Sequence, residues 1–121
     1  MQPKQSPGYK RKEPSALARQ IQADLEKFGM TQKELAIRSG MSEARVSRIL
    51  RGGSVRLTEQ DINQLAVGLG KIPAERDKLR YLAWPELHEI DKALNRHEGI
   101  VELNCHLAEK GFPLLGNDYQ E

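Results

Sequence analysis

The sequence predicts an all-α protein made of short helices, and three observations support that fold class. Aromatic residues make up only 5% of the chain, so the interior must be built from Leu, Ile, Val and Ala, a composition that suits short helices better than a sheet. Apolar residues recur three and four positions apart in successive segments, which is the spacing of one helix face. Glycine, proline and capping residues separate these segments.

The length of 121 residues permits one ordinary domain, or a smaller domain with an appendage, but not two full cores. We expect four parts, which are a disordered basic arm, a helical domain, a helical extension and an irregular tail. Their ranges are 1–13, 14–83, 84–110 and 111–121. The arm is too polar and too rich in Pro and Gly to bury a face.

The first helix is predicted to begin at Pro14, because proline lacks an N–H that would have no partner at a helix start. Gly29 can end this helix in the left-handed conformation. The apolar side chains that recur at helical spacing between them are Leu17, Ile21, Leu25 and Phe28.

Two short helices meeting at a tight turn are predicted next. Thr31 and Glu34 have the spacing of a capping box, in which each side chain accepts a hydrogen bond from the other residue's backbone N–H. The helix that starts there is expected to end at Ser39, because Gly40 can take the left-handed conformation. Ser42 can cap a third helix, which runs to about residue 51.

A fourth and a fifth helix complete the predicted domain. Thr58 can cap the fourth helix and Gly70 can end it, while Pro73 can open the fifth. The side chains expected to face inward are Ile62, Leu65, Leu69, Leu79, Leu82 and Ala83. The domain is therefore expected to contain five helices.

The extension carries two further helical patterns on either side of Gly99, the first of them opened by Pro85. The two apolar stripes are out of register across that glycine. A kinked long helix and a helical hairpin are both compatible with this pattern. The apolar positions of the stripes are Leu87, Ile90 and Leu94, then Ile100, Leu103 and Leu107.

Residues 32–51 resemble the helix-turn-helix of the Xre/Cro family of phage and bacterial repressors. Ala36 is small where the third helix crosses the second, and Gly40 takes the turn. The apolar positions of the shared core are Leu35, Met41, Val46 and Ile49. The resemblance covers about residues 17–69 and does not extend past Trp84. Ser39 departs from the family, which usually has an apolar residue there, so we expect either a looser helix end or a hydroxyl that bonds back within the turn.

The resemblance implies a five-helix repressor-like domain that reads duplex DNA with its third helix in the major groove. The positions that the family points at base edges are Ser42, Glu43, Ala44, Ser47 and Arg48. Arg48 could pair with a guanine, Glu43 could accept from a cytosine amino group, and Ala44 could touch a thymine methyl. The family would use Gln32 to hold a phosphate, helped by the dipole of its helix.

Charge distribution supports the same function independently. Residues 1–56 hold 12 basic and 5 acidic residues, whereas residues 57–121 hold 7 basic and 12 acidic ones. The first part is therefore suited to a polyanion and the second to another role. Further candidates for contacts with the DNA backbone are Lys33, Arg38, Arg45, Arg51 and Arg56, and the arm could follow an adjacent groove with Lys10, Arg11 and Lys12.

A single domain of this size buries little surface on DNA, so a homodimer on a pseudo-palindromic operator is expected. The hypothesis places the dimer interface in the extension, with the side chains Trp84, Leu87, Ile90, Leu94, Ile100, Leu103 and Leu107. The alternative is that the extension folds back on its own domain. The function that the resemblance implies is a transcriptional regulator, most simply a repressor. An antitoxin or a protein-interaction adaptor that docks through the acidic segment is the alternative.

Catalysis, metal binding and cofactor binding are not expected. His88, His97 and His106 are nine residues apart, so successive ones would point to opposite sides of a continuous helix. Cys105 is the only cysteine, which excludes an intramolecular disulfide and suggests a reducing compartment. The sequence shows neither an apolar leader nor a run long enough to cross a bilayer, so a cytoplasmic protein is expected.

Overall fold

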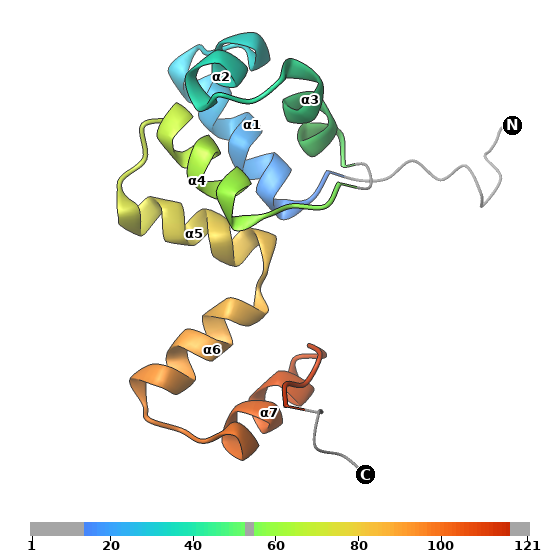
Figure 1. Cartoon of the computed structure of the whole chain (residues 1–121), viewed down its shortest axis with the longest axis vertical. Helices are drawn as coiled ribbons and strands as arrows, with labels where there is room; N and C mark the ends of the chain where they lie inside the picture. The colour runs from blue at the N-terminus through green and yellow to red at the C-terminus, as the bar shows by residue number, and fades with distance from the viewer. Residues whose placement is uncertain (1–13, 53–54, 117–121) are drawn as a thin grey trace, which may run out of the picture. The chain divides into compact units, whose positions relative to one another are not determined.

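The computed structural model describes residues 14–52 and 55–116, and these residues form helices and no strand (Figure 1). The all-α fold class is therefore confirmed. The helices are α1 (Ala16–Phe28), α2 (Gln32–Ser39), α3 (Glu43–Arg51), α4 (Glu59–Gly68), α5 (Pro73–Ala83), α6 (Glu86–Asn95) and α7 (Ile100–Glu109). The predicted basic arm at residues 1–13 lies outside the described residues.

The chain divides into two compact units between Leu79 and Arg80. This boundary falls inside α5, so the first unit holds four whole helices and the first part of a fifth. The predicted five-helix count is not matched for that reason, and seven helices are found over the described residues. We call the two parts the first unit and the second unit.

The first unit is built around one aliphatic core. In it α2 packs against both α3 and α4, and α1 packs against α3 (Figure 1). Burying each of the larger side chains contributes about 1.5–3 kcal/mol. The buried apolar side chains of this unit are Leu17, Ala18, Ile21, Leu25, Leu35, Ala36, Val46, Ile49, Leu50, Ile62, Leu65, Ala66, Leu69 and Leu79.

The first helix ends as predicted, with Gly29 in the left-handed conformation at a φ of 62°, but its start and one of its apolar side chains differ from the prediction. It is capped by Ser15, whose hydroxyl accepts a hydrogen bond from the Ala18 N–H at 3.0 Å, so Pro14 precedes the helix and does not open it. Phe28 has the spacing of a core residue but is 49% exposed, because it lies in the last turn next to Gly29, where the chain turns away.

A buried ion pair connects α1 to the segment after α4. The Lys71 ammonium lies 2.8 Å from Asp24, whose side chain is 8% exposed. The Gln20 amide donates a further hydrogen bond to the same carboxylate at 3.1 Å. Because a buried carboxylate without a partner is strongly destabilising, Asp24 and Lys71 require one another.

Helices α2 and α4 approach each other closely at Gly68. A Cβ atom at this position would be 2.9 Å from the Cβ of Ser39, 3.0 Å from a methyl of Leu35 and 3.1 Å from the Ser39 backbone nitrogen. One of these neighbours is backbone, so it cannot rotate away. Glycine is therefore required for α4 to reach α2.

We predict that Gly68→Ala lowers the free energy of unfolding by about 1–3 kcal/mol, because overpacking outweighs the better helix propensity of alanine. Urea denaturation followed by circular dichroism measures this difference. Val67→Ala is the matched control, since Val67 is the neighbouring position on α4 and is 70% exposed. Equal stability of the two variants would contradict the close packing.

The second unit contains a helical hairpin, which decides between the two arrangements left open by the sequence. Residues 96–99 separate α6 from α7, and His97 within them has a φ of 57°. Ala93, Leu103 and Leu107 form a small buried core, with Ile90 and Phe112 packed against it. The hairpin thus buries only part of each predicted stripe, because Leu94 and Ile100 remain exposed.

Polar contacts hold this hairpin together at two points. The Glu89 carboxylate, whose side chain is 8% exposed, lies 3.3 Å from Lys92 and 3.5 Å from Lys110. Burial acts to raise the pKa of Glu89, but the hydrogen bond from Lys92 and the charge of Lys110 outweigh it, and the pKa is lowered. Asn104 lies within α7, and its side chain exchanges two hydrogen bonds with the backbone of Leu115 in the segment after that helix, at 2.9 and 3.0 Å.

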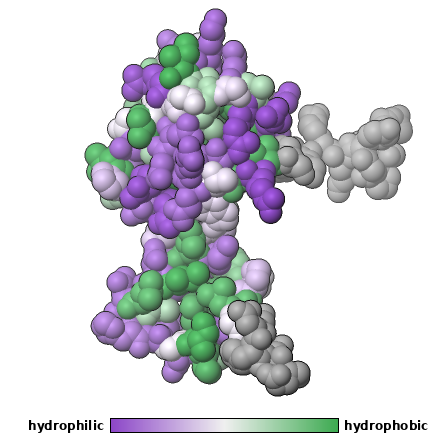
Figure 2. Space-filling model, viewed as in Figure 1, coloured by the Kyte–Doolittle hydropathy of each residue, from purple (hydrophilic) through white to green (hydrophobic). Residues whose placement is uncertain are grey.

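Exposed apolar side chains remain on the second unit after the hairpin has formed. Figure 2 shows hydrophobic surface gathered over this unit, in contrast to the largely hydrophilic face of the first unit. The exposed large apolar residues of the second unit are Leu94, Ile100, Val101, Leu114 and Leu115.

Candidate nucleic-acid interface

The pair formed by α2 and α3 begins with the predicted capping box. The Thr31 N–H donates to the Glu34 carboxylate at 2.8 Å, and the Glu34 N–H donates to the Thr31 hydroxyl at 3.0 Å. Two backbone N–H groups that have no partner within the helix are thereby satisfied at the start of α2. The capping box that the sequence predicted is confirmed.

The turn between α2 and α3 has the predicted geometry. Gly40 has a φ of 70°, and the Met41 N–H donates to the Ala36 carbonyl at 3.0 Å, which closes the helix end. Ser42 then caps α3 by accepting a hydrogen bond from the Arg45 N–H at 3.0 Å. Two short helices are thus joined by a turn of minimal length.

Ser39 does not loosen the end of α2. Its side chain is buried, and its hydroxyl donates to the Leu35 carbonyl at 2.6 Å. Of the two expectations for this position, the bond back within the turn is the one found. A small side chain is also required here, because the backbone of Gly68 lies against it.

Helix α4 braces the turn through side chains that sequence reasoning missed. The Gln64 amide donates to the carbonyls of Ser39 and Gly40, at 3.1 and 3.2 Å. The Arg38 guanidinium donates to the Gly68 carbonyl at 2.7 Å. Gln64 carries no sequence signal for this role, because only the fold brings it to carbonyls 24 and 25 positions earlier.

Helix α3 has one buried and one exposed side. Val46, Ile49 and Leu50 are buried against the first unit. On the other side, four of the five positions proposed to read bases are exposed and Ser47 is half-buried. Those positions are Ser42, Glu43, Ala44, Ser47 and Arg48. We call these five residues the reading face.

The residues expected to contact the DNA backbone are in two different situations. Gln32 is half-buried at the start of α2, and three others are exposed, namely Lys33, Arg51 and Arg56. The guanidinium groups of Arg38 and Arg45, in contrast, have partners within the protein. The structure therefore separates cations free to meet phosphate from cations that hold the fold.

The Arg45 guanidinium is bound to α4. It donates through Nε to Asp61 at 3.1 Å and through Nη2 to the second Asp61 oxygen at 2.5 Å. The hydrogen bond from Arg45 holds the pKa of Asp61 below its ordinary value of 3.8, burial acts in the opposite direction, and Thr58 adds to the lowering. The same hydrogen bond raises the pKa of Arg45.

We predict that the contribution of Asp61 to stability is lost in acid. A lowered folded-state pKa makes this contribution fully present above 3.8 and removes it as the pH falls through the folded-state pKa. At about neutral pH, Asp61→Asn should cost roughly 1–3 kcal/mol, because it weakens hydrogen bonds made to a charged group.

Urea denaturation of the wild type and of Asp61→Asn from about pH 7 to about pH 2.5 measures this effect, since the folded-state pKa governs where the contribution is lost. The difference between the two proteins should shrink as the pH falls. Because both proteins share all other carboxylates, the difference isolates Asp61. A difference that stays constant over this range would contradict the assignment.

The structure divides the side chains predicted to form a dimer interface. Leu103 and Leu107 are buried in the hairpin core, so a partner could reach them only if the hairpin opened. Leu94 and Ile100 are 67% and 42% exposed. Ile90 packs against the hairpin core, and Trp84 and Leu87 are half-buried.

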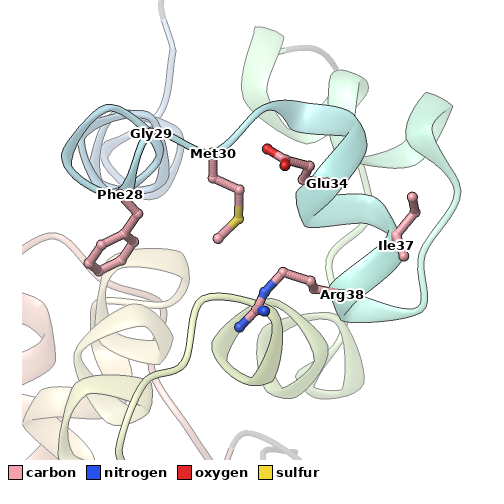
Figure 3. Close-up of a pocket in the computed structure, with 6 residues that line it drawn as sticks. All are labelled: Phe28, Gly29, Met30, Glu34, Ile37 and Arg38. Atoms are coloured by element: carbon pink, nitrogen blue, oxygen red, sulfur yellow. The ribbon is translucent and has the colours of Figure 1, made fainter.

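A shallow hollow of about 320 Å³ lies between the end of α1 and α2 (Figure 3). Phe28 and Met30 line it from one side, and Ile37 lines it from α2. Its two charged lining residues are engaged, since Glu34 closes the capping box and Arg38 binds the Gly68 carbonyl. The lining therefore offers no buried charged group free of a partner, and we assign the hollow no ligand.

The histidines and the cysteine of the second unit do not gather. The rings of His88 and Tyr81 are in contact, tilted by 58° with centroids 4.9 Å apart, and His106 lies 3.4 Å from Glu98. Among the described residues no three His, Cys, Asp or Glu side chains are placed to hold a metal ion. Over the same residues, every helix is too short or too polar to cross a bilayer.

Comparison with known proteins gives one match. The family described as a helix-turn-helix domain matches residues 12–79, which is more than half of the chain and includes α1 to α4 and the first part of α5. Comparison with curated proteins and with solved structures gives no match.

Proposed function

We propose that this chain, which belongs to the helix-turn-helix domain family, is a transcriptional regulator that reads a specific duplex DNA sequence with α3. One observation carries the proposal. Four of the five residues of the reading face are exposed, the opposite side of α3 is buried, and α4 holds the turn that precedes it. A helix presented in this way fits the major groove.

The chemistry of the reading face suits base edges more than phosphates. Ser42, Ala44 and Ser47 are small, so the helix backbone can come close to the floor of the groove. Arg48 offers two donors for the acceptors of a guanine, and Glu43 offers an acceptor for a cytosine amino group. A carboxylate at this position would be repelled by phosphates, which favours a role in reading bases.

The finer proposal is a repressor of Xre/Cro type that occupies an operator and excludes polymerase. Its support is the sequence resemblance of residues 32–51 together with the placement of Gln32 at the first position of α2. There the backbone N–H groups and the helix dipole favour a phosphate. Lys33, Arg51 and Arg56 would add further contacts to the backbone.

We predict that Arg48→Ala and Gln32→Ala weaken DNA binding in different ways. Loss of Arg48 should cost roughly 1–3 kcal/mol and relax specificity at one base pair, whereas loss of Gln32 should weaken binding to all sequences equally. The measurement is a titration of a duplex selected from a random library and of its single-base variants. Lys78→Ala, an exposed change on α5, is the control. Equal losses on all sequences for both variants would contradict the assignment.

The same titration at several salt concentrations separates a DNA reader from the adaptor alternative. A reader releases counterions from the DNA, so its affinity falls steeply as salt rises, and it keeps a sequence preference. A chain that uses this fold only to dock another protein through its acidic segment would show neither property.

We further propose that two copies bind one operator through their second units. The apolar surface gathered over that unit supports this, because contiguous exposed apolar patches mark sites of protein–protein interaction. Leu94 and Ile100 belong to the interface predicted from sequence. Val101, next to Ile100, and Leu114 and Leu115, after α7, are further exposed apolar residues of the same unit.

We predict that Leu94→Glu or Val101→Glu turns a dimer into a monomer, because either change places a charge in an apolar contact. Sedimentation equilibrium of the full chain measures the mass. Asn95→Glu adds the same charge to an exposed polar position beside Leu94 and should leave the dimer intact. A monomeric wild type, or a dimer that survives both changes, would contradict this interface.

A further inference from the structure

Arg45 lies on the flank of α3, between the reading face and the buried side. With 3.6 residues in each turn, Arg45 falls between Arg48 on one side and Ile49 on the other. Sequence reasoning places it among the cations that contact phosphate. Its side chain is 31% exposed, and its hydrogen bonds run to the protein.

Three separate segments meet at this guanidinium. Arg45 itself belongs to α3, and its Nη2 donates to the backbone carbonyl of Arg56 at 2.9 Å, in the segment before α4. Nε and Nη2 also bind both oxygens of Asp61 in α4. The Asp61 carboxylate is fixed in turn, because the Thr58 N–H donates to it at 2.9 Å. We call this set of contacts the Arg45 bridge.

The bridge uses most of the hydrogen-bonding capacity of Arg45. A guanidinium has five N–H donors, and those on Nε and Nη2 are taken up by Asp61 and Arg56. The charge is also compensated, because the Asp61 carboxylate lies 2.5 Å away with a side chain that is only 8% exposed. A compensated charge contributes little to the release of counterions from DNA.

We infer that Arg45 is a positioning residue for DNA reading and not a phosphate contact. This inference rests on the proposed function. The contacts of Val46, Ile49 and Leu50 hold α3 on the core, but apolar contacts are not directional. A bidentate ion pair is directional, so the bridge fixes the rotation of α3 about its own axis and with it the direction of the reading face.

The test compares Arg45→Gln, Arg45→Lys and Asp61→Asn with Arg51→Gln. The last change removes the same charge from an exposed position of the same helix. Affinity is measured in full-length protein for a duplex selected from a random library and for an unrelated duplex, at several salt concentrations. Arg45→Lys keeps the charge but cannot form the bidentate pair, so it isolates geometry from charge.

We expect the three bridge variants to weaken binding to the selected duplex about tenfold or more. Their affinity for the unrelated duplex should not fall, and the salt slope should not change. Arg51→Gln should weaken binding to both duplexes and reduce the slope by about 0.9. The ratio of the two affinities is the informative quantity, because a loss of folded protein lowers both affinities equally.

Two results would overturn the inference. If Arg45 contacts a phosphate, Arg45→Gln will reduce the salt slope by about 0.9 and weaken binding to both duplexes, while Asp61→Asn leaves the selected duplex bound as before. Equal losses on both duplexes in all three bridge variants would show that the bridge supports folding alone.

Amide hydrogen exchange on the free protein tests, without DNA, whether the Arg45 bridge holds α3 in place. Arg45→Lys and Asp61→Asn should speed exchange at residues 46–50 relative to α1. Unchanged exchange in α3, or equal acceleration in every helix, would overturn the inference. A wild type that binds no duplex would instead contradict the proposed function. The exchange result would still show whether the Arg45 bridge holds α3 in place.

Discussion

The close packing of α4 against the end of α2 is the constraint on which the rest of the first unit depends. Gly68 brings the two backbones together, and the small side chain of Ser39 leaves room for it. At this distance the Gln64 amide reaches two carbonyls of the turn, those of Ser39 and Gly40. Helix α4 thus fixes the conformation of the turn, and the turn sets the direction in which α3 begins.

Most of the helix-turn-helix pair follows from local sequence. The capping box at Thr31 and the left-handed Gly40 act over three or four residues, so spacing alone reveals them. The roles of Asp61, Gln64 and Gly68 depend on contacts between residues far apart in the chain. A capping pattern shows that Asp61 can face Thr58, but it gives no sign that the carboxylate also binds Arg45.

The second unit shows where periodicity stops being informative. The apolar stripes on either side of Gly99 predict helical structure correctly. They leave open whether it is one kinked helix or a hairpin, and they do not say which surface covers each stripe. In the structure Leu103 and Leu107 are buried against the other helix of the hairpin, while Leu94 remains exposed. A stripe that faces its own hairpin and a stripe that faces another molecule have the same spacing.

The reading face shares almost no polar contacts with the scaffold, and this has a consequence for how such a protein can change. Apart from the cap formed by Ser42, no hydrogen bond or ion pair within the described residues involves the side chains of Glu43, Ala44, Ser47 or Arg48. New residues at the three exposed positions, Glu43, Ala44 and Arg48, would therefore change the free energy of unfolding little. The preferred target sequence can diverge in evolution while the architecture that presents it is retained.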